Sequence, residues 1–144
     1  KAYEIAEKYP DQLIIGSDTI VDFDGRIIGK PDDAQHAEQL TRELFSSSHM
    51  VITGLAILNL NKNIEIIQSD TTTVYPKQLT ETQIAQHIQS GNWEGKAGAY
   101  GIQESGDEFV ERIEGSFTNV MGLPMELMGK LLDDLQIQPK EKAG

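Results

Sequence analysis

The chain contains no cysteine, which excludes disulfide bonds and thiolate metal sites from its chemistry. It also contains no apolar run that approaches the roughly 18 residues needed for a membrane-spanning helix. Both absences fit a cytoplasmic setting, and we expect a cytoplasmic protein without membrane association. Its 144 residues, 38% of them hydrophobic, are enough to build one globular domain around a core.

Positive charge is scarce as well, with 12 lysine and arginine residues against 23 aspartate and glutamate residues. The formal net charge of −11 disfavours nucleic acid as a partner, because binding to its backbone depends on clustered cations. A small anionic ligand is compatible with this charge if a divalent cation and a few local lysines offset the negative field.

Hydrophobic patterning predicts strands and helices in irregular alternation. The predicted elements are, in order, strands at 12–16, 20–23 and 26–28, a helix at 31–45, strands at 50–60 and 64–75, a helix at 80–89, a strand at 108–113 and a helix from 124. This order predicts an α/β fold with a mixed, twisted sheet flanked by helices, rather than a regular doubly wound fold.

The chain begins inside a helical pattern. Apolar residues recur with helical spacing at Ala2, Ile5, Ala6 and Tyr9, and no Ser, Thr, Asp or Asn precedes them as an N-cap. We therefore expect the natural N-terminus to lie upstream of Lys1.

An acidic residue, Asp18, follows the apolar run at 13–15, so we expect it where a strand ends and a loop begins. Such ends commonly carry binding groups in open α/β sheets. A carboxylate there can hold Mg²⁺ or take a proton from an attacking water. The other interpretation is that Asp18 caps a turn through its own backbone, as aspartate often does.

Two lysines stand in segments that suit phosphate binding. Lys30 lies in Gly-Lys-Pro, where the proline restricts it to extended geometry and the glycine allows close approach of a ligand. Lys96 opens the glycine-rich stretch 96–103, whose backbone N–H groups can approach a bound anion. For both lysines, a solvent-exposed loop is the alternative interpretation.

The glycine-rich stretch offers further groups to a ligand. Gln103 can present a donor and an acceptor to a base edge, and Tyr100 a flat surface for stacking. Trp93 either lines this region or anchors its loop. The sequence contains no Walker A loop, dinucleotide fingerprint, G-x-S-x-G elbow or HExxH metal motif.

Several short stretches occur in a defined order, and together they are far more specific than any one alone. They are Gly16-Ser17-Asp18-Thr19, Asp24-Gly25, Gly29-Lys30-Pro31, Thr53-Gly54, the run 95–103, Ile113-Glu114-Gly115 and the run 119–124. This ordered set spans nearly the whole chain and resembles the Maf family of nucleoside triphosphate pyrophosphatases, whose older name is septum-formation inhibitor.

The resemblance implies a reaction and a set of site residues. The reaction is hydrolysis of a nucleoside triphosphate between its α and β phosphates, with Mg²⁺ or Mn²⁺ as cofactor. The resemblance places the general base or metal-associated carboxylate at Asp18, and it assigns Lys30 and Lys96 to neutralising the triphosphate. Thr19 and Gln103 match positions associated with base selectivity.

The resemblance also implies a substrate branch and an architecture. An Asp-Thr pair combined with Tyr-Gly-Ile-Gln is the pattern of the dTTP/UTP branch. The implied protein is a nucleoside triphosphate diphosphatase that acts as a housecleaning enzyme on pyrimidine nucleotides, modified ones included. The implied fold is an α/β cleft between two lobes, often in a homodimer.

One family feature is not found in the sequence. Family members begin with a strand and a Ser-x-Ser-Pro-Arg-Arg segment that grips phosphate, whereas Arg26, Arg42 and Arg112 stand in other contexts. We therefore expect residues 1–144 to form a single Maf-like domain without that strand and segment. We also expect this chain alone to be impaired or inactive, whereas the parent protein is active. Two alternatives stay open: a non-catalytic nucleotide-binding or regulatory protein linked to cell division, and a pyrophosphatase for 7-methyl-GTP or CTP.

Overall fold

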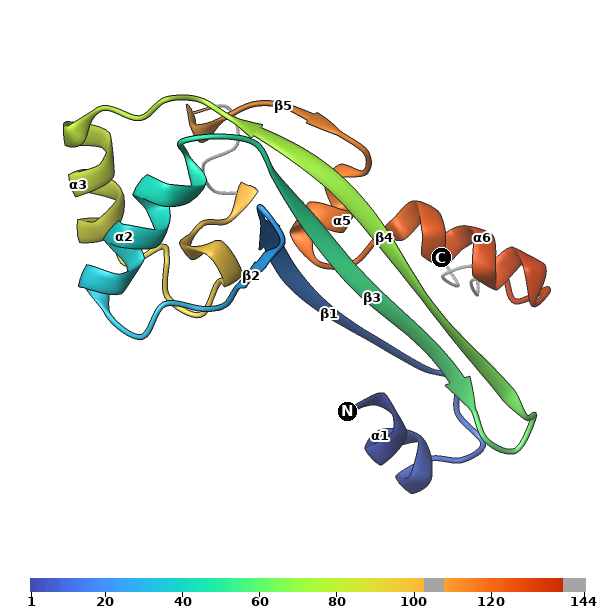
Figure 1. Cartoon of the computed structure of the whole chain (residues 1–144). Coiled ribbons are helices and arrows are strands. Elements are labelled where there is room, and N and C mark those ends of the chain that lie inside the picture. Colours follow the sequence, from blue (N-terminus) through green and yellow to red (C-terminus); the bar gives the residue numbers. More distant parts are fainter. Residues whose placement is uncertain (103–107, 139–144) are drawn as a thin grey trace, which may run out of the picture.

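The computed structural model describes residues 1–102 and 108–138, and its centre is a five-stranded sheet of order β2-β1-β3-β4-β5 (Figure 1). The strands are β1 (Ile14–Phe23), β2 (Arg26–Ile28), β3 (His49–Asn59), β4 (Ile64–Pro76) and β5 (Val110–Glu114). The helices are α1 (Ala2–Lys8), α2 (Ala34–Leu44), α3 (Glu81–Ser90), the 3₁₀-helix η1 (Ala97–Ala99), α5 (Phe117–Met121) and α6 (Met125–Asp134). These elements confirm the α/β class expected from the sequence.

Every strand pairing within the described residues is antiparallel. For this part of the chain, the expectation of a mixed sheet, with parallel and antiparallel pairs, is therefore wrong. Two of the pairings are hairpins: β1 turns into β2 through Asp24-Gly25, and β3 turns into β4 through residues 60–63. Short turns of this kind join antiparallel neighbours, whereas parallel neighbours need long crossover connections.

The first strand is longer than expected, because β1 is continuous where the sequence predicted two strands, at 12–16 and 20–23. Its pairing with β3 is continuous through residues 17–19, which lie between the two predicted strands, and Asp18 pairs with Gly54. Gly16 does not break the strand but makes room for α1, since a Cβ there would lie 3.0 Å from the Cβ of Ala2. Asp18 thus lies within a strand, and the expected position at a strand end is wrong.

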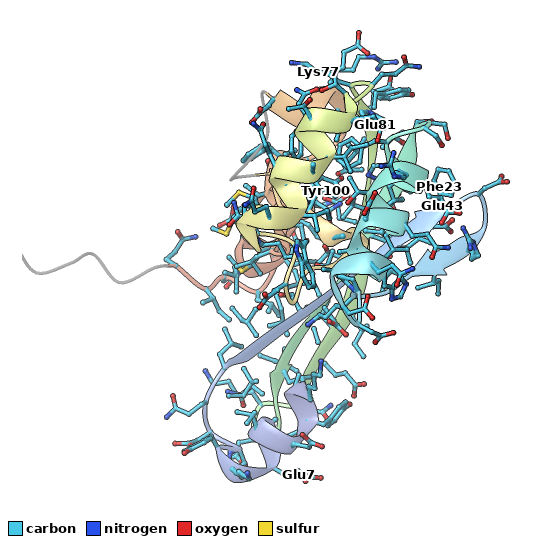
Figure 2. The ribbon with its side chains drawn as sticks, turned by 90° about the vertical axis from the view of Figure 1, so that its left-hand side faces the viewer. Glu7, Phe23, Glu43, Lys77, Glu81 and Tyr100 are labelled. Carbon is cyan, nitrogen blue, oxygen red and sulfur yellow. The ribbon has the colours of Figure 1, made fainter. Side chains whose placement is uncertain are left out.

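Helices cover the sheet at its two ends. Figure 1 shows α2 and α3 together at one end, whereas α1 lies near the other end of the long strands. In Figure 2, Tyr100 lies among the side chains at the α2 and α3 end, and Glu7 of α1 lies at the opposite end. None of the helices in the described part of the chain is long and apolar enough to cross a membrane.

The main hydrophobic core forms where α2 and η1 pack against β1 and β3. Within it, the rings of Phe45 and Tyr100 meet edge to face, with centroids 5.3 Å apart. A smaller cluster that contains Leu55 and Leu131 joins α6 to the sheet. Burial of a large apolar side chain contributes about 2 kcal/mol, so the main core firmly supports the segments that lie on it.

Helix α3 supports the glycine-rich segment that follows it. Thr80 and Gln83 form the predicted capping box, which fixes the start of the helix. In the last turn, the buried His87 donates a hydrogen bond from Nε2 to the carbonyl of Ala99, at 2.7 Å. The position of η1 is therefore tied to a helix with a well-defined start.

His49, at the start of β3, gives the core a pH dependence. It is 2% exposed, and its Nε2 lies 2.7 Å from the hydroxyl oxygen of Tyr100. Burial lowers the pKa of His49 below its ordinary value of 6.5. Between this lowered pKa and 6.5 the unfolded chain binds a proton that the folded chain does not, so stability is lost as the pH falls through that window.

We expect the free energy of unfolding to decrease between about pH 7.5 and about pH 5.5, by at most about 1.4 kcal/mol per pH unit from His49 alone. Urea denaturation at both pH values measures this decrease. The variant His49→Gln keeps a polar group opposite Tyr100 but does not titrate, so its decrease should be smaller. Equal decreases in the two proteins would contradict a buried, neutral His49.

A second stability prediction concerns Gly98 in η1. Its φ is +73°, and a Cβ there would lie 2.9 Å from Cδ1 of Leu44 and 3.2 Å from Cγ2 of Val21. Gly98→Ala should therefore lower the free energy of unfolding by about 2 kcal/mol, through backbone strain and steric overlap.

Urea denaturation of Gly98→Ala beside a matched variant, Gly129→Ala in α6, measures this effect. Nothing lies within 4 Å of a Cβ at Gly129, and alanine favours a helix, so the control should be as stable as wild type or more so. Wild-type stability of Gly98→Ala would show that this close packing does not exist.

Candidate active site

A cavity of about 300 Å³ opens along β1. Its lining comes from separate parts of the chain: residues 17–19 and 21 of β1, Lys30, Val51 of β3, residues 95–97 and 100–102 around η1, and residues 120–122 at the end of α5. Ligand pockets generally measure about 300–1,000 Å³, so this volume suits a small molecule or part of one. The structure thus brings Asp18, Thr19, Lys30 and Lys96 to one cavity, whereas Gln103 lies outside the described residues.

Consecutive residues of β1 reach this cavity because it lies at the strand's edge. β2 pairs with β1 only at residues 21–23, so Ile14–Ile20 have no strand on that side among the described residues. Successive side chains of a strand point to opposite faces, and Asp18 therefore points away from the face that carries Thr19. At an open edge, groups from both faces are accessible to one ligand.

The two lysine-bearing segments are joined directly to each other. The backbone N–H of Gly98 donates to the carbonyl of Gly29, at 3.1 Å. This bond brings Lys30, next to Gly29, to the same cavity as Lys96, which precedes η1. The Nζ of Lys96 also donates to the carbonyl of Asn92, at 2.6 Å. Two ammonium groups on one cavity favour an anionic ligand.

Asp18 supplies a carboxylate at the same cavity. Its side chain is 77% exposed, and its Oδ2 lies 3.8 Å from the Nζ of Lys1. Because Asp18 lies within β1, the alternative that it caps a turn is wrong. An exposed carboxylate can hold a metal ion or accept a proton.

Behind β1, a buried polar network links the sheet to α5. The hydroxyl oxygens of Thr19 and Thr53 lie 2.9 Å apart, and Thr53 donates to the carbonyl of Asn119 at 3.0 Å. The side-chain Nδ2 of Asn119 donates to the Thr72 hydroxyl at 2.9 Å and to the Val51 carbonyl at 3.1 Å. Thr53, Thr72 and Asn119 are each 0% exposed.

No role for this network is predicted from the sequence. Thr53-Gly54 and the run from Asn119 are there only short stretches of the resemblance. A threonine in a predicted central strand and an asparagine before an apolar run were the available signals. Their pairing depends on the tertiary contact between β3 and α5, which neither local signal indicates.

Two aromatic residues of this region are mainly structural. Tyr100 is 6% exposed and packs against Phe45, so little of its ring is available for the expected stacking. Trp93 donates from Nε1 to the carbonyl of Ile88, at 2.9 Å, and packs against the main core. It does not line the cavity, so of the two interpretations Trp93 anchors its loop.

A divalent cation fits this site only if groups other than protein side chains supply most of its ligands. The described residues contain no group of three or more His, Cys, Asp or Glu side chains that could enclose a metal ion. Mg²⁺, however, usually keeps several waters and binds one or two carboxylates together with substrate phosphates. Asp18 suits that type of site, in which waters and the substrate phosphates bring most of the ligands.

Comparison with known proteins identifies close relatives of this chain. A "dTTP/UTP pyrophosphatase" of Ruminiclostridium cellulolyticum is 42% identical over 135 residues, which cover 94% of this chain and 70% of the relative. Proteins of the same name from Shouchella clausii and Pyrococcus furiosus are 42% and 40% identical over 139 and 133 residues. These alignments cover 96% and 92% of this chain, and 72% and 69% of the two relatives.

The family comparison covers nearly the same part of the chain as these alignments. The family model described as "Maf-like protein" matches residues 1–135, from α1 to the end of α6. It thus includes the cavity on β1 and both lysine-bearing segments. The chain belongs to the Maf-like protein family.

Proposed function

We propose that this protein is a nucleoside triphosphate pyrophosphatase that hydrolyses dTTP and UTP to the monophosphate and pyrophosphate. The observation that carries the proposal is the meeting of Asp18, Lys30 and Lys96 at one cavity of suitable size. Its substrate class is supported by the relatives, which bear the name dTTP/UTP pyrophosphatase at about 40% identity.

In this proposal, Asp18 acts as the general base. A water molecule attacks the α-phosphorus, and its oxygen becomes part of the monophosphate. The bond from the α-phosphorus to the bridging oxygen breaks, so pyrophosphate leaves with the bonding electrons. Asp18 takes the proton of the attacking water and later returns it to solvent.

The two lysines stabilise charge during this reaction. Negative charge grows on the bridging oxygen as the bond to the α-phosphorus breaks. Lys30 and Lys96 provide ammonium groups on the same cavity, close enough to a bound triphosphate to offset this charge. They also offset the overall charge of −11, which would otherwise repel a triphosphate.

A divalent cation completes the proposal. Mg²⁺ or Mn²⁺, held by Asp18 and the phosphates, would add positive charge to the reacting phosphoryl groups. Thr19 would contact the base, because it shares the cavity with the lysines but lies on the sheet face of Val21 and Val51. Gln103 is a further base-contacting residue in this proposal.

The variant Asp18→Asn tests the proposal. It removes the proton acceptor and the metal-binding charge while keeping the shape of the side chain, so pyrophosphate release from UTP or dTTP should fall about 10²–10⁴-fold. The measurement is steady-state pyrophosphate release in the presence of Mg²⁺ or Mn²⁺.

A matched control is Asp134→Asn, at the end of α6 and not among the cavity residues. It removes the same charge and should leave the rate unchanged. Circular dichroism of both variants checks that the fold is intact. A folded Asp18→Asn protein that keeps most of its turnover would rule out Asp18 as the general base.

A further inference from the structure

The hydrogen bonds behind Thr19 have a single direction. The Thr53 hydroxyl donates its only proton to the carbonyl of Asn119, at 3.0 Å. Its oxygen lies 2.9 Å from that of Thr19, and it has no second proton to give. Thr19 is therefore the donor in this pair. With its own proton used, the Thr19 hydroxyl can offer only lone pairs to the cavity that it lines.

Asn119 keeps this direction fixed. Both protons of its Nδ2 are engaged, by the Val51 carbonyl at 3.1 Å and by the Thr72 hydroxyl at 2.9 Å. A carbonyl only accepts, so the side chain has one orientation. The backbone N–H of Asn119 donates to Oγ of Ser116, at 3.1 Å. The carbonyl of Asn119 also accepts from the Gly122 N–H, at 3.0 Å, and stays aimed at Thr53. If Thr53 donated to Thr19 instead, its oxygen would face this carbonyl oxygen at 3.0 Å with no proton between them, which is unfavourable in a buried site.

The strand register places Thr19 beside apolar side chains on one face of the sheet. Thr19 pairs with Thr53 across β1 and β3, and Val21 pairs with Val51 on the same face two residues further on. Beside Thr19, this face of the sheet therefore presents apolar side chains to the cavity. A nucleotide has a charged polyphosphate end and a neutral base, and these apolar side chains suit the base.

We propose that Thr53 and Asn119 are positioning residues that select the base by holding Thr19 as a hydrogen-bond acceptor. Uracil and thymine carry a proton on N3, which the Thr19 oxygen can accept. Cytosine carries a lone pair on N3, so two acceptors would face each other without a proton between them. The preference for uracil and thymine over cytosine thus comes from the direction of one hydroxyl group. This inference rests on the proposed function.

The variants Thr53→Val and Thr53→Ser test this inference. Valine has the shape of threonine but cannot accept from Thr19, whose hydroxyl is then able to turn and donate to N3 of cytosine. We expect the ratio of kcat/KM for UTP to that for CTP to fall about tenfold in Thr53→Val. Serine keeps the hydroxyl, so Thr53→Ser should keep the wild-type ratio. A merely structural role would lower the rates for both nucleotides equally.

A variant on the cavity side complements this pair. Thr19→Val removes the acceptor itself and should also lower the UTP/CTP ratio about tenfold, whereas Thr19→Ser should keep it. Even if Thr53→Val does not fold, these variants test whether base selection depends on an acceptor at Thr19. An unchanged ratio in Thr19→Val, or in a folded Thr53→Val, would overturn the inference.

Calorimetric binding of the α,β-imido analogues of UTP and CTP separates this inference from the proposed function. Wild-type protein that prefers the UTP analogue, and loses this preference in Thr53→Val, would support base selection even if no pyrophosphate were released. Hydrolysis of UTP with an unchanged ratio in Thr53→Val would overturn base selection alone. Protein that neither binds nor hydrolyses UTP would refute both.

Discussion

The hydrogen bond from the Gly98 N–H to the Gly29 carbonyl is the contact on which the site depends, at 3.1 Å. It joins two segments that are far apart in the sequence, and each carries a lysine of the cavity. Two ammonium groups at one cavity repel each other, so they do not gather there without support. The main hydrophobic core holds these segments in place, because Gly98 packs against Leu44 of that core.

The antiparallel sheet supplies the other half of the site. Because β2 is short, most of β1 presents an open edge among the described residues, and Asp18 and Thr19 lie on that edge. The alternation of side chains gives the two residues different environments. Asp18 is exposed to solvent and suits proton transfer, whereas Thr19 is tied to the buried network of Thr53 and Asn119. One strand can thus serve the reacting phosphates and the base.

Local patterns in the sequence predicted the elements that depend on local interactions. The capping box of Thr80 and Gln83, the Asp24-Gly25 hairpin and the central strand β3 all lie where their sequence signals placed them. The glycines beside Lys30 and Lys96 also indicated segments suited to phosphate binding, and both segments line one cavity.

The parts that could not be predicted depend on contacts between distant segments. Gly16 resembled the end of a strand, because the sequence does not show that α1 packs over it. The hydroxyl chain from Thr19 to Asn119 exists only after β1, β3 and α5 are assembled. Tyr100 resembled a stacking surface, because its burial against Phe45 is a tertiary contact.

The most direct test of the shared cavity is a crystal structure of the protein with the α,β-imido analogue of UTP bound. We expect its triphosphate to lie between the Nζ atoms of Lys30 and Lys96, beside Asp18, with the pyrimidine ring against Thr19. An analogue bound at another surface, or with its phosphates directed away from both lysines, would contradict the single site described for this chain.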